Sequence, residues 1–394
     1  MKRLVCTTAG LLLVLAALQG CAPAATPTTV PATETAAPAA VAPVATEAPT
    51  LAAVQPTETL IPYPTPDVGT MMIDTTKWKK PGPWTIGYAN PSTSNSWRVM
   101  TVASILYGAQ VMYPDKIKGL VITNANDSVP KQISDMEDML VKGVDAILVA
   151  PTDSTALCPV IEKAMSQGVP VIILERGVNC TDYVTFIDAN AAGQAGFQAT
   201  WLVNQLGGQG NVVYMGIIPG ITISGVTEAT VNGIFAQNKG IKELAFDYAW
   251  VSRSKGKTLM EAWLRAYPKI DGVIGWSGAE IMGALEAAQE AGRDKQIKAW
   301  VGADDMGWLQ LIADGKVNGA GYIGYADCSI DGLQAAIKTL SGQPVPYYWK
   351  LPVIGITKDN VAKYLIPNAP EEWFPSRYIS ADQMQKWVNA AGAY

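Results

Sequence analysis

Short apolar runs alternate with amphipathic segments along the chain from Trp84 onward. The apolar runs predict strands at 84–90, 119–125, 145–151, 169–175, 184–190, 211–217, 244–251, 272–276, 298–304 and 319–325. Apolar residues at helical spacing between them predict helices at 130–143, 156–167, 192–206, 255–266, 279–291 and 330–341. Continuously apolar strands that alternate with helices are typical of parallel sheets covered on both faces.

Chain length and a repeated layout indicate two similar halves. Roughly 310 residues follow Trp84, too many for one small core and enough for two lobes. The stretches "GVDAILVAP" at 143–151 and "IDGVIGWSG" at 270–278 share one order, in which a helix end is followed by Gly or Asp, a buried strand and a polar turn. We therefore predict an α/β fold of two doubly wound parallel-sheet lobes.

Residues 1–20 have the pattern of a secretory signal peptide. Lys2 and Arg3 precede an apolar run that reaches Leu18 and is too short to span a bilayer comfortably. The adjoining "LQGC" ends at Cys21 and resembles the lipobox of bacterial lipoproteins, which implies cleavage before Cys21 and acylation of its thiol. The alternative is an ordinary signal peptide with an incidental cysteine.

Residues 21–80 are expected to form a lipid-anchored, disordered tether. From Ala22 to about Pro66 the chain is nearly all Ala, Pro, Thr and Val, and no Lys or Arg occurs between Arg3 and Lys77. Such a segment cannot bury enough side-chain surface to offset its ordering entropy. We expect it to hold the folded part away from a membrane, with the lipid as the membrane contact.

The charge balance and the absence of histidine narrow the functional classes. Loss of Lys2 and Arg3 with the signal peptide reduces the basic residues from 29 to 27 against 34 acidic ones, so the formal net charge changes from −5 to −7. This balance argues against a nucleic-acid partner. Histidine, the commonest general base and metal ligand, does not occur in the chain. We expect no metal, no cofactor and a monomer.

Five cysteines leave one possible disulfide in an extracytoplasmic protein. Cys6 leaves with the signal peptide and Cys21 is the expected lipidation site, so Cys158, Cys180 and Cys328 remain. We expect Cys158 to pair with Cys180, because both follow adjacent predicted strands. The three spacings do not form a zinc motif.

Polar and aromatic side chains follow the predicted strands. Ligands of open parallel sheets bind beyond the carboxyl ends of the strands, so these side chains form the candidate site. They are Asn95, Trp97 and Arg98 after the first strand, Glu175 and Arg176 after the fourth, and Trp250, Ser277, Asp304 and Tyr325 in the second half. Such a mixture suits a pyranose or furanose. The CH faces of the sugar lie on indole rings, and each hydroxyl needs a hydrogen-bond donor and an acceptor.

Glu175 and Arg176 stand side by side where an apolar strand ends. A carboxylate and a guanidinium together can bracket vicinal hydroxyls, because the acid accepts hydrogen bonds and the guanidinium donates them. The alternative is a local ion pair at a solvated strand end, which would contribute little.

Several stretches resemble, in order and spacing, the ribose-type branch of type I periplasmic binding proteins, the sugar receptors of bacterial ABC importers. They are "APTDST", "QGVPVIILERG", "FIDAN", "VGADD" and "PVIGITKDNV", and "NSWR" at 95–98 is similar to the first binding loop of the galactofuranose-type subgroup. The resemblance implies a receptor in lipoprotein form, not an enzyme. It would capture a monosaccharide-like sugar or polyol between two closing lobes and deliver it to an ABC permease.

The resemblance also implies how the two lobes divide the chain. Three crossings would join them, around "FIDAN", "YIGYAD" and residues 345–351. The N-terminal lobe would comprise 81–188 plus about 326–350, and the C-terminal lobe 189–325 plus about 351–394. Closure would be a hinge motion that buries the ligand.

Roles in binding are carried over from the family position by position. In the first lobe, Trp97 would stack on the sugar and Arg98 would bond a hydroxyl or ring oxygen. Glu175 and Arg176 match an acid–arginine pair that holds hydroxyls, although Asp is usual where this chain has Glu175.

In the second lobe, Asp304 matches the cleft aspartate of a "GxD" turn, and Ser277 stands where Asn is common. Tyr325 falls near the last binding position, and Trp250 lies near a turn that often carries an aromatic residue. Thr230 departs from the pattern, because the family usually presents an arginine there. Arg98 or Arg253 could compensate for that missing cation.

Two other functions fit the same residues. A sensory receptor would bind the same sugar but pass the signal to a chemotaxis or kinase partner. A lipid-anchored glycoside hydrolase would use Glu175 and Asp304 as a carboxylate pair across a cleft.

Overall fold

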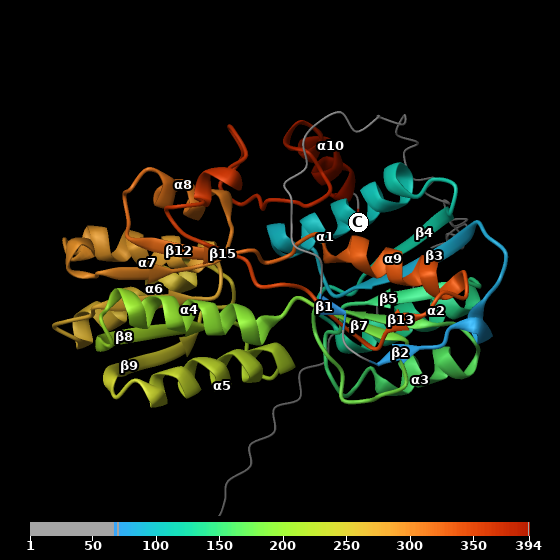
Figure 1. The fold of residues 1–394 in the computed structure, drawn as a ribbon, viewed down its shortest axis with the longest axis horizontal. Coiled ribbons are helices and arrows are strands. Elements are labelled where there is room, and N and C mark those ends of the chain that lie inside the picture. The colour runs from blue at the N-terminus through green and yellow to red at the C-terminus, as the bar shows by residue number, and fades with distance from the viewer. Residues whose placement is uncertain (1–66, 69–70, 393) are drawn as a thin grey trace, which may run out of the picture. The chain divides into compact units, whose positions relative to one another are not determined.

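The computed structural model of the chain describes residues 67–68, 71–392 and 394. The expected signal peptide, Cys21 and most of the expected tether lie outside the described residues. The described part contains two mainly parallel sheets, and helices cover both faces of each (Figure 1). None of the described helices is long and apolar enough to cross a membrane.

The N-lobe is built on a seven-stranded sheet. The strand order is β1 (Asp67–Val68), β14 (Tyr348–Lys350), β7 (Thr185–Asp188), β6 (Val171–Leu174), β5 (Ala146–Val149), β3 (Trp84–Asn90) and β4 (Ile117–Asn124). All neighbours pair in parallel except β1, which runs antiparallel to β14. One face carries α2 (Val129–Val141) and α3 (Cys158–Ser166); the other carries α1 (Ser96–Tyr107), α9 (Cys328–Leu340) and α10 (Ala381–Ala391).

Burial on both faces explains why the central strands have unbroken apolar sequences. In β5, Ile147 and Val149 contact the core beneath α2 and α3, whereas Ala146 and Leu148 contact the core beneath α1 and α9. Successive side chains of a strand point to opposite faces, so neither face of such a strand accepts a polar residue. The first positions open to polar side chains therefore lie beyond the strand ends, as after Leu174.

The C-lobe repeats this plan on a six-stranded sheet. Its strand order is β15 (Gly355–Ile356), β12 (Gly319–Tyr322), β11 (Ala299–Val301), β10 (Gly272–Gly275), β8 (Gln209–Gly216) and β9 (Gly240–Tyr248), with only β15 antiparallel to its neighbour. One face carries α4 (Ala191–Gln205) and α5 (Thr222–Gln237); the other carries α6 (Arg253–Ala266), α7 (Gly278–Glu290) and α8 (Met306–Ala313). The predicted α/β class with two parallel-sheet lobes is thus confirmed.

Part of the expected tether belongs to the N-lobe. β1 joins the large sheet, and β2 (Met72–Ile73) pairs with β13 (Val345–Pro346). In the 3-10 turn η1 (Thr76–Trp78), Trp78 is buried against Val184 and Val345. The tether therefore ends before residue 80, because a few apolar side chains in this stretch find partners that are remote in sequence.

Hydrogen bonds hold the three expected crossings against one another. Asn190 Nδ2, at the start of α4, donates to Leu351 O at 3.0 Å. Gln194 Nε2 donates to Ala189 O at 2.7 Å and to Ile323 O at 3.1 Å. Buried amide side chains thus satisfy the backbone carbonyls of the segments that join the lobes.

A fourth passage between the lobes follows the 3-10 turn η4 (Val361–Lys363). Glu371 O and Trp373 O accept hydrogen bonds from the first two backbone N–H groups of α8 in the C-lobe, at 2.9 and 2.8 Å. The chain then reaches the N-lobe, where α10 lies beside α1 (Figure 1). Trp387 of α10 packs edge-on against Tyr107 of α1, with ring centroids 5.5 Å apart. The expected assignment of 351–394 to the C-terminal lobe is therefore corrected for its last part. β15 belongs to the C-lobe sheet, but the apolar face of α10 is buried on α1 of the N-lobe.

Arg377 fixes this fourth passage to the N-lobe through a buried ionic cluster. Its Nε and Nη2 donate to Asp327 Oδ1 at 3.1 and 2.8 Å, and its Nη1 donates to Asp331 Oδ1 at 3.2 Å. All three side chains are less than a tenth exposed. Tyr378 adds a hydrogen bond to Asp331 Oδ1 at 3.0 Å.

Replacing Arg377 with Met should reduce the free energy of unfolding by about 3–5 kcal/mol, because two carboxylates would stay buried without their cation. Arg253→Met is the matched control: Arg253 pairs with Glu286 and Glu371 at a half-exposed site, so the loss should stay near 1 kcal/mol or below. Urea denaturation of both variants measures the difference. Equal losses would contradict the assignment of the buried cluster as the anchor.

Candidate ligand-binding site

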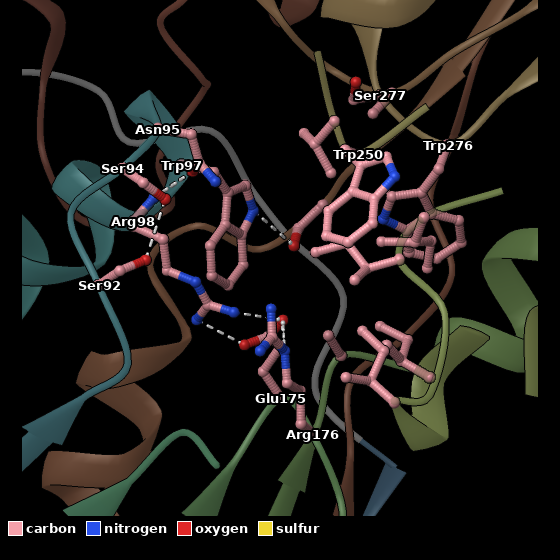
Figure 2. A pocket seen from close by; sticks show the side chains of 18 of the residues that line it. Ser92, Ser94, Asn95, Trp97, Arg98, Glu175, Arg176, Trp250, Trp276 and Ser277 are labelled. Carbon is pink, nitrogen blue, oxygen red and sulfur yellow. Dashed lines mark hydrogen bonds and ion pairs between the residues drawn. The ribbon is translucent and has the colours of Figure 1, made fainter. Parts of the chain in front are cut away.

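A cavity of about 560 Å³ lies at the carboxyl ends of strands from both sheets (Figure 2). This is the edge at which open α/β sheets bind ligands, and small-molecule pockets span roughly 300–1,000 Å³. Of the nine predicted site residues, the cavity is lined by Asn95, Trp97, Arg98, Glu175, Arg176, Trp250, Ser277 and Asp304.

Arg98 and Glu175 form a buried two-point ion pair on the N-lobe side (Figure 2). Arg98 Nη1 lies 2.6 Å from Glu175 Oε2, and Nη2 donates to Oε1 at 3.0 Å. Burial would raise the pKa of Glu175, but the guanidinium groups of Arg98 and Arg176 outweigh it and lower that pKa. Glu175 is therefore an ionised acceptor at neutral pH.

Arg176 adds a guanidinium that still has donors to offer. Its Nε lies 3.4 Å from Glu175 Oε1 and makes no hydrogen bond within the described residues. Its Nη1 makes one long hydrogen bond, 3.4 Å, to Pro151 O. Burial and the neighbouring charge of Arg98 lower the pKa of Arg176. Two guanidinium groups around one carboxylate leave a surplus of N–H donors that hydroxyl oxygens can satisfy.

Local backbone geometry presents this network to the cavity. Asn95 caps α1, its Oδ1 accepting from Arg98 N at 3.0 Å, so Trp97 and Arg98 lie in the first helical turn. Glu175 has a φ of +64°, and Trp250 a φ of +58°. Left-handed backbone is costly for residues other than glycine and persists where surrounding contacts enforce it, often at functional sites.

Trp97 and Asp304 meet at the second crossing. Trp97 Nε1 donates to Gly324 O at 3.3 Å, and Asp304 Oδ2 accepts from Gly324 N at 2.9 Å. A Cβ at Gly324 would lie 3.0 Å from Asp304 Oδ1, so only glycine fits comfortably between them. Asp304 Oδ1 is buried without a hydrogen bond in the described part of the chain.

Buried acids without a cation characterise the C-lobe side. Burial raises the pKa of Glu280 to about 8 and that of Asp305 to about 6, and it raises the pKa of Asp304 well above its usual range. Backbone N–H groups are their partners: Glu280 Oε1 accepts from Trp276 N and Ser277 N, and Asp305 Oδ2 accepts from Gly278 N. The raised pKa of Asp304 favours its protonated form, in which the carboxyl group donates a hydrogen bond.

Ser277 is committed to the start of α7. Its Oγ accepts from Glu280 N at 3.3 Å, which completes a capping box with Glu280. The residue still borders the cavity. Its main structural role is thus to hold the helix terminus that faces the ligand space.

Tyr325 is not among the residues that line the cavity. Its hydroxyl donates to Pro352 O at 2.5 Å, and the Arg377 guanidinium lies 4.8 Å from the ring centroid, so the ring is held by contacts outside the cavity. The expectation that Tyr325 contacts ligand is therefore corrected. Gly324, one residue earlier, lines the cavity in its place.

The arginine that the family usually presents at position 230 is missing, and Arg253 does not replace it at the cavity. Thr230 packs towards Gly196 of α4, and Arg253 is paired with Glu286 and Glu371. Neither residue lines the cavity. Among the described lining residues, the cations are Arg98 and Arg176, both of the N-lobe.

Sequence reasoning missed the apolar part of the lining. This part includes Ile217, Ile218, Ile221, Ile223 and, from the fourth passage, Phe374. An aliphatic loop and a lone Phe far along the chain carry no motif that could have revealed them. Their shared position depends on tertiary contacts that the chain pattern does not encode.

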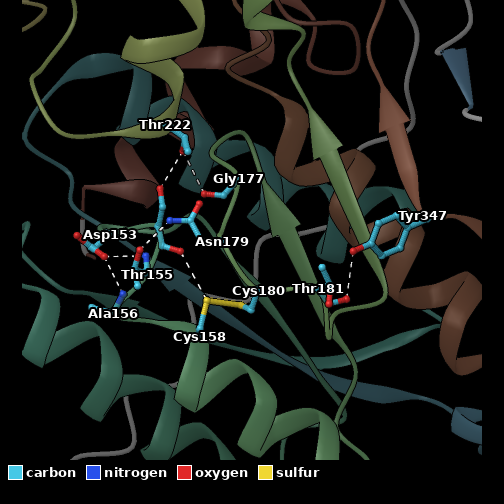
Figure 3. Close-up of a disulfide and its surroundings, with 11 residues drawn as sticks. Asp153, Thr155, Ala156, Cys158, Gly177, Asn179, Cys180, Thr181, Thr222 and Tyr347 are labelled. Carbon is cyan, nitrogen blue, oxygen red and sulfur yellow. Dashed lines mark hydrogen bonds between the residues drawn. A yellow bond between two sulfur atoms is a disulfide. The ribbon is translucent and has the colours of Figure 1, made fainter.

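A disulfide joins the first residue of α3, which follows β5, to the loop after β6 (Figure 3). Cys158 and Cys180, the pair expected from the sequence, are bonded with their Cα atoms 5.6 Å apart. Thr222 of α5 in the C-lobe touches the loops after β5 and β6, since its Oγ1 lies 2.9 Å from Ser154 Oγ and donates to Gly177 O at 3.2 Å. The rim on which the lobes meet is therefore covalently braced.

A family model described as "Periplasmic binding protein domain" matches residues 86–344. The chain belongs to this family, and the resemblance drawn from the sequence is confirmed. Phe374 and the fourth passage lie beyond the matched region.

Named relatives and solved structures agree with this assignment. The chain is 27% identical over 248 residues to the ribose import binding protein of Bacillus subtilis, covering 61% of this chain and 79% of that protein. It is 29% identical over 248 residues to a xylitol-binding protein of Mycolicibacterium smegmatis, covering 61% and 69%. A Mycobacterium smegmatis structure in complex with β-D-fucofuranose matches with a TM-score of 0.66 and 25% identity, covering 78% of this chain and 98% of that one.

A further solved neighbour is the fructose-binding periplasmic domain of a hybrid two-component system, with a TM-score of 0.64 and 26% identity over 71% of this chain and 92% of that one. The two relatives and this domain are named as binding proteins for a sugar or a polyol, and the Mycobacterium smegmatis structure holds a sugar. The chain is therefore a binding protein and not a glycoside hydrolase.

Glu280→Gln should become progressively more stable than the wild type as the pH rises from about 5 to 8. The folded wild type keeps Glu280 protonated up to a pKa of about 8, whereas the unfolded chain releases that proton near 4.5, so folding loses stability across this window. Gln preserves the capping box but does not titrate. Urea denaturation at several pH values measures the effect.

Glu290→Gln, at the exposed partner of Lys257, is the control and should show no such trend. A stability difference between Glu280→Gln and wild type that stays constant with pH would contradict the assignment.

Proposed function

We propose that the chain is a lipid-anchored extracytoplasmic receptor that captures a sugar or polyol between its lobes and delivers it to an ABC permease. The observation that carries this proposal is the buried Arg98–Glu175–Arg176 network, which has unused donors in a cavity shared by both lobes. Ribose-, xylitol- and galactofuranose-binding relatives support the ligand class.

Each polar group of this network suits one part of a hydroxylated ring. Arg176 would donate to hydroxyl oxygens, while Glu175, ionised and held by Arg98, would accept from hydroxyl hydrogens. Trp97 would lie against a CH face of the ring. Asp304, from the C-lobe, would add a carboxyl group that contacts the ligand only when the two lobes close around it.

Closure follows from the two-sided character of the cavity. A ligand that contacts both lobes forms all its interactions only in the closed state, so binding shifts the equilibrium toward closure. The two lobes already touch at one edge of the cavity, where Thr222 of the C-lobe contacts Ser154 and Gly177 of the N-lobe. A permease that recognises this closed arrangement would receive loaded receptors in preference to empty ones.

A sensory receptor is the second candidate. It is favoured by the likeness to the periplasmic domain of a hybrid two-component system. Affinity capture of the membrane partner from cells that make the full chain separates the two functions: a permease supports transport, whereas a kinase or chemotaxis receptor supports sensing.

The proposal is tested by a thermal-shift screen of the purified mature protein against pentoses, hexoses, polyols and inositols. A true ligand should raise the melting temperature in proportion to the logarithm of its concentration above the dissociation constant. Titration calorimetry of the best compound should give one site per chain. If none of these compounds shifts the melting temperature, the sugar or polyol class is wrong.

Arg176→Ala should abolish the ligand-induced shift while leaving the unliganded melting temperature nearly unchanged. Arg98 still pairs with Glu175 in this variant, so no buried charge is left alone. Arg98→Ala is the matched comparison, and it should itself reduce stability by about 3–5 kcal/mol because Glu175 loses its two-point partner. Melting curves with and without ligand separate the two effects, and collapse of unliganded Arg176→Ala would make this residue structural.

A further inference from the structure

The two walls of the cavity differ sharply in chemistry. The N-lobe wall presents charged and polar groups, among them Arg98, Glu175, Arg176 and Asn95. The opposite wall is formed mainly by Ile217, Ile218, Ile221, Ile223, Trp250 and Trp276. Figure 2 shows Trp250 and Trp276 across the cavity from the Arg98–Glu175–Arg176 network.

Few polar groups on the C-lobe wall are available to a ligand. Ser277 Oγ accepts from Glu280 N in the capping box and keeps only its O–H to donate, and Tyr322 donates to Trp276 O and keeps only its oxygen to accept. Asp304 Oδ1 remains as a buried oxygen without a partner, and none of the described lining cations belongs to the C-lobe. A ligand hydroxyl placed against this aliphatic wall would lose its water without gaining a hydrogen bond, which is unfavourable.

Two aromatic residues extend the apolar wall. The Trp250 side chain is 52% exposed, which few large apolar side chains of the described residues are. Its backbone is left-handed, with a φ of +58°, and so is that of Val251, with a φ of +54°. A β-branched residue in left-handed backbone is rare, so the fold tolerates strain to hold this loop at the cavity. Phe374 also lines the cavity. It belongs to the fourth passage, which lies outside the region that matches the family model.

We infer that the natural ligand is two-faced: a hydroxylated ring bound by the N-lobe carries an apolar substituent, such as an aryl or alkyl aglycone, bound against the C-lobe wall. This inference rests on the proposed function and names its ligand class more narrowly. The apolar substituent gains by leaving water, whereas a second polar ring would leave unpaired hydroxyls there. The cavity of about 560 Å³ has the size of sites for ligands with both parts.

The test compares matched methyl and phenyl glycosides by titration calorimetry on the mature protein. Suitable pairs are the β-D-ribofuranosides, β-D-galactofuranosides, α-L-arabinofuranosides and β-D-glucopyranosides, with the free sugars beside them. In at least one pair, the phenyl glycoside should bind about tenfold or more tightly than the methyl glycoside. Trp250→Ala and Ile218→Thr should each reduce this phenyl-to-methyl ratio severalfold.

Val226→Ala is the control, because Val226 is exposed on α5 and does not line the cavity, so the ratio should stay as in the wild type. Methyl glycosides or free sugars that bind without any phenyl preference would overturn the inference and leave the proposed function intact. A preference that survives both Trp250→Ala and Ile218→Thr would also overturn it. Failure of every free sugar and glycoside to bind would overturn the proposed function as well.

Discussion

Burial of both faces of the parallel sheets is the constraint on which the rest of the structure depends. It forces the central strands to be apolar along their whole length, as in β5 and β6, and leaves the strand ends as the nearest places for charge. Glu175 follows Leu174 directly, so an ionised carboxylate lies at the point where the apolar strand ends. The cavity is formed by such ends from both lobes, which is why a scaffold of apolar strands presents a charged site.

Buried charge is then stable only with its partners, and the same rule operates at two places. Glu175 is held by Arg98 beside the cavity, and Arg377 is held by Asp327 and Asp331 at the fourth passage. The first cluster leaves donors on Arg176 free for a ligand, whereas the second uses its charges within the fold. The first cluster can therefore bind a ligand, whereas the second anchors the C-terminal segment and so places Phe374 against the site.

The sequence pattern predicted the parts that depend on local periodicity and on strand ends. The sheets and the positions of Arg98, Glu175, Arg176 and Asp304 beside one cavity belong to this class. The ion pair between Arg98 and Glu175 was not predicted, because the two residues are 77 positions apart in the sequence. Tyr325 was misplaced because its ring is held by Pro352 O and the Arg377 guanidinium, two partners that the strand pattern does not reveal. The fourth passage and Phe374 could not be predicted, because they depend on packing of α10 on α1 and on an ionic cluster between segments about 50 residues apart.

A crystal structure of the mature protein with its tightest-binding sugar or glycoside tests the central claim most directly. The account predicts one unmodified ligand between the lobes, with hydroxyls on Glu175 and Arg176 and its least polar face toward Trp250. A ligand bound on another surface, or one whose hydroxyls avoid the Glu175–Arg176 pair, would contradict it.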